Sequence, residues 1–82
     1  MSFPREVLNE LKWHPDRSLE SAEIAYGHRG APNDLKVIPG NDISELGRSF
    51  FSTRESRIPY HRIRRIRVLS PGGEVVRSWE FD

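Results

Sequence analysis

The dipeptide His-Arg occurs twice in this chain, as His28-Arg29 and as His61-Arg62. Each copy lies beside a turn signal, since Gly30 follows the first and Pro59-Tyr60 precedes the second. Arginine offers a planar pair of donors to phosphate oxygens, and histidine exchanges a proton near neutral pH. Gly30 would let the backbone approach a ligand closely. Together these residues predict a phosphate site at one rim of the fold. The alternative is that the histidines bond buried carbonyl groups and the arginines are solvated.

A basic stretch surrounds the second copy. Between Arg57 and Arg67 the sequence has five arginines and no acid, although the net charge of the whole chain is only +1. Such a stripe suggests a local anionic partner. A positively charged strand can follow a nucleic-acid backbone, and charge on an edge strand can equally protect it from aggregation. Both interpretations apply to the three arginines of the strand that follows the turn, Arg64, Arg65 and Arg67.

Aromatic side chains could add base stacking, which contributes about 1–3 kcal/mol per base in proteins that bind single strands. We predict this role for Tyr60, because it adjoins His61. Trp13 and Trp79 are predicted to serve packing between the helix and the sheet instead.

Composition limits the kind of protein this can be. The 82 residues predict a single domain over 1–82, and 35% hydrophobic with 30% charged residues predicts a thin core. The chain has no cysteine, and its three histidines include no close pair, so we expect no disulfide, metal site or cofactor. No apolar run or leader-like segment indicates a membrane partner, which favours a soluble, cytoplasmic protein.

Hydrophobic spacing predicts one helix over residues 4–13, ended by His14-Pro15, and then a polar loop to residue 21. Tyr60 to Ile63 break the alternation and predict a 3₁₀-like turn, after which Ile66 and Val68 should face away from Arg65 and Arg67. Short strands are expected at residues 22–27, 35–38, 43–46, 49–53, 64–69 and 75–81, with a further strand ending at Ile58-Pro59 and a hairpin turn at 70–73. This order predicts an α+β fold, with the N-terminal helix packed on a strongly bent antiparallel sheet or small open barrel of five or six strands.

Four blocks of the sequence, at residues 4–13, 28–32, 36–40 and 58–63, belong to a match that extends over nearly the whole chain. In these blocks it resembles the RNA cyclic group end recognition domain family, which consists of small, mostly archaeal, uncharacterised proteins. The resemblance implies recognition of RNA ends that carry a 2′,3′-cyclic phosphate, in RNA processing or repair. It also implies association with RNA ligase or phosphoesterase proteins. By position, the residues carried over are His28, Arg29, Gly30, Tyr60, His61 and Arg62.

Three hypotheses follow. In the first, the arginines and histidines bind the cyclic phosphate, Tyr60 stacks on the terminal base, and the arginine strand follows the upstream phosphates. In the second, the protein is a phosphodiesterase or nuclease with His28 and His61 as acid and base. The two-histidine phosphoesterases repeat His-x-Thr/Ser, whereas here Gly30 and Ile63 stand at the hydroxyl position. In the third, the arginine strand docks to another protein of an RNA-processing complex.

Overall fold

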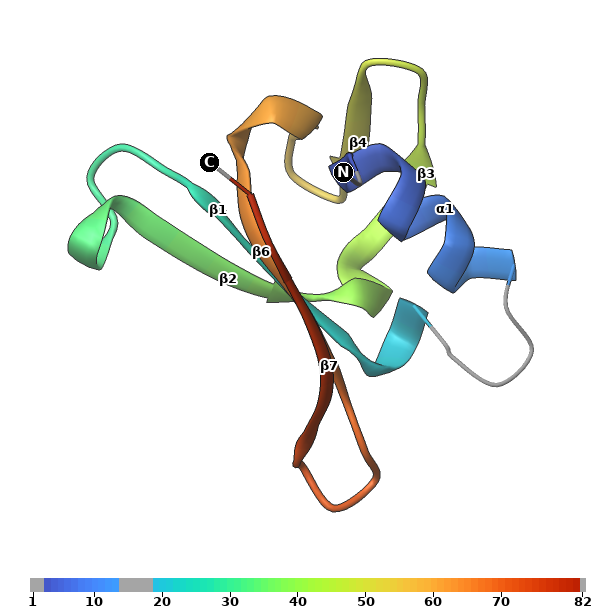
Figure 1. Ribbon diagram of the computed structural model, residues 1–82. Coiled ribbons are helices and arrows are strands. Elements are labelled where there is room, and N and C mark those ends of the chain that lie inside the picture. The colour runs from blue at the N-terminus through green and yellow to red at the C-terminus, as the bar shows by residue number, and fades with distance from the viewer. Residues whose placement is uncertain (1–2, 14–18, 82) are drawn as a thin grey trace.

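A computed structural model describes residues 3–13 and 19–81, in which the chain forms one α-helix, seven strands and four 3₁₀ turns (Figure 1). The helix and strands are α1 (Pro4–Trp13), β1 (Ala22–Gly27), β2 (Leu35–Pro39), β3 (Ile43–Leu46), β4 (Phe50–Thr53), β5 (Arg57–Pro59), β6 (Ile63–Leu69) and β7 (Val75–Glu80). The 3₁₀ turns are η1 (Leu19–Ser21), η2 (Pro32–Asp34), η3 (Gly40–Asp42) and η4 (Tyr60–Arg62).

Helix α1 has the predicted bounds. Its buried residues, Val7, Leu8 and Leu11, lie at helical spacing and join the core. Residues 14–18 lie outside the described part of the chain, so the predicted helix end at His14-Pro15 does too. The last three residues of the predicted polar loop form η1. Within the described residues, no helix has the length and apolar character needed to cross a membrane.

Four strands form the larger antiparallel sheet, in the order β2-β1-β6-β7. Its central row is apolar, because Ile24 pairs with both Ile38 and Ile66, and Ile66 pairs with Trp79. Ile66 and Val68 are buried, so the predicted alternation along β6 is confirmed. This inner face supplies most of the core that α1 and the second sheet cover.

The smaller sheet has the order β3-β4-β5, and its Phe51 and Ile58 are buried in the same core. The α+β class is confirmed, but the strands form two sheets and not one bent sheet. The reason lies at two prolines. Pro39 ends β2 before η3, and Pro59 ends β5 before η4; the chain changes sheet at both places. Proline has no N–H to donate to a ladder, so it ends pairing there.

Candidate functional site

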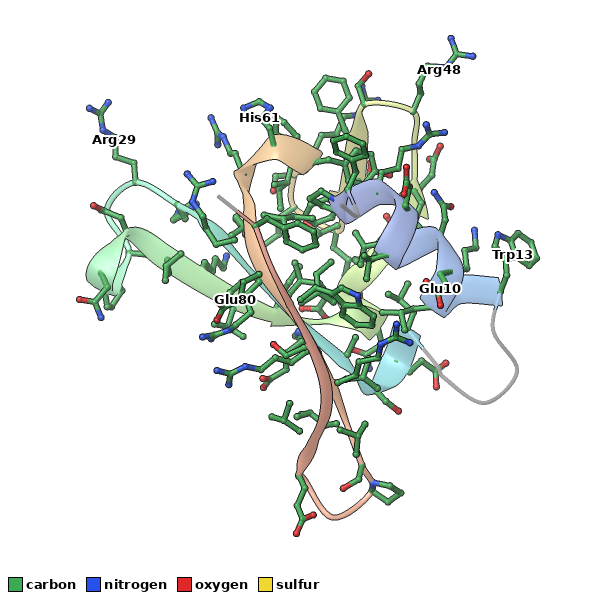
Figure 2. The ribbon with its side chains drawn as sticks, in the orientation of Figure 1. Glu10, Trp13, Arg29, Arg48, His61 and Glu80 are labelled. Carbon is green, nitrogen blue, oxygen red and sulfur yellow. The ribbon has the colours of Figure 1, made fainter. Side chains whose placement is uncertain are left out.

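The loop after β1 has a defined shape. The backbone N–H of His28 donates to the Asp34 carbonyl at 2.8 Å, and that of Asp34 donates to the Ala31 carbonyl at 2.8 Å. Gly30, Asn33 and Asp34 have positive φ angles of 93°, 57° and 56°. Glycine, asparagine and aspartate are the residues that tolerate this region best. The sequence therefore specifies a tight loop that holds His28 and Arg29 at the end of β1, as Figure 2 shows for Arg29.

The second segment, η4, is anchored by Tyr60. Its hydroxyl donates to the Gly47 carbonyl at 2.7 Å, and its ring lies 5.9 Å from the Phe51 ring between centroids. Burial raises the pKa of the Tyr60 phenol, and the nearby Arg5 guanidinium opposes that shift. Tyr60 is only 8% exposed, so the predicted stacking on a terminal base is not supported. Its ring is part of the core, where it positions His61 and Arg62 on the surface.

An open cavity of about 430 Å³ lies between the loop after β1 and the start of β6. A β-bulge shapes it. Ala25 pairs with Arg65 and Tyr26 pairs with Ile63, so Arg64 has no partner across the ladder. A Cβ atom at position 27 would lie 3.8 Å from the Arg62 carbonyl oxygen and 4.0 Å from a guanidinium nitrogen of Arg64. The residues lining the cavity are Gly27, His28, Arg29, Asn33, Asp34, Leu35, Arg62 and Arg64.

The cavity carries more positive than negative charge. Arg29, Arg62 and Arg64 are all exposed, and Asp34 is the acid in the lining. Considering residues 3–13 and 19–81, none of these three arginines forms a salt bridge with a carboxylate. One nitrogen of Arg64 donates to the His61 carbonyl at 3.3 Å, which orients the guanidinium. The arginines are therefore available to an anion.

The structure brings together only part of the predicted set. His28, Arg29, Arg62 and Arg64 line one cavity. His61 is exposed on η4 but outside the lining, and Figure 2 shows it on the outer side of that turn. Gly30 shapes the loop through its φ angle and does not line the cavity, so the close approach predicted for it has no counterpart here. Gly27 does line it, and the sequence signal for that was a glycine directly before His28-Arg29.

Arg65 and Arg67 lie on the outward face of the larger sheet but outside the lining of the cavity. Arg65 pairs with Glu80 on β7, and Arg67 pairs with Glu23 on β1. Opposite charges directly across a ladder attract one another. These two arginines are half-buried among their neighbours and separate from the cavity.

A second cavity, of about 310 Å³, lies between β2 and the turn after β4. Its cations, Lys36 and Arg54, share the lining with Asp42 and Glu55. The mixture of signs makes it a poorer site for an anion than the first cavity.

The aromatic residues are arranged differently from the prediction. Trp79 is half-buried beneath Arg77, as a packing role requires, but Trp13 is 75% exposed at the end of α1 (Figure 2). One exposed ring near η4 is Phe50, at 45%, while its neighbour Phe51 is fully buried. Successive residues of a strand point to opposite faces, so the adjacent pair Phe50-Phe51 was the sequence signal that one of the two rings would be exposed.

The fold and site together define a small α+β domain with a cationic surface cavity. The chain belongs to the MJ1316 RNA cyclic group end recognition domain family, whose profile matches residues 1–80. It is 43% identical over 68 residues to a UPF0248 protein of Methanococcus maripaludis strain C7, covering 83% of this chain and 88% of that one. It is 42% identical over 76 residues to a UPF0248 protein of Thermococcus onnurineus, covering 93% and 82%. No solved structure matches the chain.

Proposed function

We propose that this protein binds RNA ends that carry a 2′,3′-cyclic phosphate, and that the cavity between the loop after β1 and β6 holds the phosphate. The observation that carries the proposal is the convergence of Arg29, Arg62 and Arg64 with His28 on one cavity. The description of the family agrees with it.

The chemistry of the lining suits this ligand. A cyclic phosphate has one negative charge and two free oxygens, which a planar guanidinium can bind through paired N–H donors. The imidazole of His28 can donate to a further oxygen. Because Gly27 has no side chain, the floor of the cavity stays open in front of Arg64. Three arginines with a single acid would bind the phosphate firmly without discriminating between bases.

Such a domain would act in RNA processing or repair, in the cytoplasm. Its partners would be phosphoesterases and RNA ligases, since those enzymes make or consume cyclic ends.

Catalysis is the competing function. General acid–base opening of a cyclic phosphate needs two proton-transfer groups at one phosphate. His28 lines the cavity and His61 lies outside its lining, which favours binding over cleavage.

The test is fluorescence anisotropy with one short RNA prepared with a 2′,3′-cyclic phosphate, a 3′-phosphate or a hydroxyl end. We expect the cyclic end to bind most tightly and to remain intact on a gel afterwards. The double variant Arg29→Ala/Arg62→Ala should lose affinity for that end by on the order of 100-fold, because hydrogen bonds to charged groups contribute about 1.5–3 kcal/mol each. The control is Arg54→Ala, on the turn after β4, which removes one positive charge as each of those two substitutions does.

The outcomes separate the hypotheses. Equal binding of all three ends would contradict end recognition and would indicate a protein that binds the RNA backbone. Conversion of the cyclic end would establish the enzyme. Absence of RNA binding would favour the third hypothesis, in which the arginine strand docks to another protein.

A further inference from the structure

The outward face of the smaller sheet carries an exposed phenyl ring next to η4. Phe50 pairs with Pro59, and Ser52 pairs with Arg57, so these four residues share one face of the β4–β5 ladder. We call this the Phe50 face. Its opposite side holds Phe51 and Ile58, which are buried in the core. The core therefore accounts for Phe51 and leaves Phe50 without a comparable structural role.

The turn η4 links the Phe50 face to the cavity. Pro59 is the cap residue of η4, and Arg62, at the other end of η4, lines the cavity. A three-residue 3₁₀ turn advances roughly 6 Å, comparable to the reach of a single nucleotide. The backbone N–H of Tyr60 donates to the Ser49 carbonyl at 3.4 Å, which fixes η4 beside the start of β4. In Figure 1, η4 lies between the loop after β1 and strand β4.

The charges around the Phe50 face suit a polyanion. Arg57 lies on the face itself, exposed, and His61 is exposed on η4 between the face and the cavity. Arg48 is exposed at the turn before β4 (Figure 2). The acid on this sheet is Glu45 of β3, which pairs with Ser52. An aromatic ring between cations is the arrangement by which proteins hold single-stranded nucleic acid.

We propose that Phe50 stacks on the base of the nucleotide next to the RNA terminus, while the terminal cyclic phosphate occupies the cavity and Arg57 meets a phosphate further upstream. This inference rests on the proposed function and extends it, because it makes single-stranded RNA of two or more nucleotides the ligand. It also assigns the base-stacking role to Phe50 instead of Tyr60.

The test compares two ligands, uridine 2′,3′-cyclic monophosphate and an RNA tetranucleotide ending in the same cyclic phosphate. Phe50→Ala should weaken tetranucleotide binding by roughly 10-fold, within the range of base–aromatic stacking, and leave the mononucleotide within about twofold of the wild type. Phe50→Trp should retain tetranucleotide binding, and its thermal unfolding shows whether the site tolerates substitution. Trp13→Ala, at an exposed aromatic residue on the far end of α1, is the matched control.

Unchanged tetranucleotide binding by Phe50→Ala would overturn this inference, as would an equal loss for both ligands. Failure of the proposed function would look different. In that case Arg29→Ala/Arg62→Ala would bind the mononucleotide as well as the wild type, or the wild type would bind neither ligand.

Discussion

The arginines of the basic strand β6 are of one residue type but have different surroundings. At its start, Arg64 lies at the β-bulge, beside Gly27 and in the cavity. From the next residue the ladder is regular, and Arg65 and Arg67 lie opposite Glu80 and Glu23 on the neighbouring strands. The first arginine is exposed, whereas the other two are half-buried.

The difference shows that a run of arginines is not one surface. A bulge removes one residue from the alternation and turns its side chain towards a site, while regular pairing places the next arginines opposite carboxylates. Binding of an anion should therefore depend on the position of an arginine in the ladder and not on the total charge of the strand.

Within β6, the largest expected effect comes from comparing Arg64→Gln with Arg67→Gln. Arg64→Gln should reduce affinity for the cyclic RNA end by about 10-fold or more, as expected for losing a charged hydrogen bond of about 1.5–3 kcal/mol. Arg67→Gln removes the same charge and should change affinity by less than about twofold, since Arg67 lies outside the cavity lining, opposite Glu23 in the ladder. Anisotropy titrations at one salt concentration measure both. Equal losses would mean that the whole strand binds RNA.

A smaller effect is expected on stability, through the residue that holds η4 beside the cavity. Tyr60→Phe removes the hydrogen bond to the Gly47 carbonyl and should cost about 1 kcal/mol, or roughly 4–8 °C in the melting temperature. Tyr26→Phe is the control at another buried tyrosine, whose hydroxyl has no hydrogen bond with the described residues. A Tyr60→Phe protein as stable as the wild type would argue against this anchor.

Tyr60 also predicts a pH dependence. Burial raises its pKa above the ordinary value of 10.0, so folding favours the protonated phenol. The resulting stabilisation is fully present below pH 10.0 and is lost as the pH rises through the folded pKa. Denaturant titrations should show this alkaline loss in the wild type and a weaker one in Tyr60→Phe.

The smallest effect should follow from removing the carboxylates that lie opposite Arg65 and Arg67 in the ladder. Glu23→Gln/Glu80→Gln removes the carboxylates opposite Arg67 and Arg65. We expect all RNA ends to bind slightly more tightly, with the salt dependence steeper by about 0.7 in log–log slope per new phosphate contact. A gain confined to the cyclic end would place these arginines in the end site and remove the distinction between them and Arg64.

Local patterns predicted the elements well, for identifiable reasons. Helical spacing of Val7, Leu8 and Leu11 after a proline predicted α1, and a broken alternation after Pro59 predicted η4. Alternation also predicted which residues of β6 are buried. The site was predicted in part, because His28-Arg29 and Arg62 lie beside turn signals that bring them to the rim. Tyr60 and His61 were assigned by adjacency, and neighbours in a turn point in different directions.

The sequence by itself determined the helix, most strand positions, the α+β class and the two segments that contribute cations to the cavity. These depend on period and on the conformational limits of proline and glycine, which act within a few residues. Tertiary structure decided how the strands divide between two sheets, which arginine lies at the bulge, and which aromatic ring is exposed. Those features depend on the register between strands distant in the chain, and a shift of one residue moves every side chain to the opposite face.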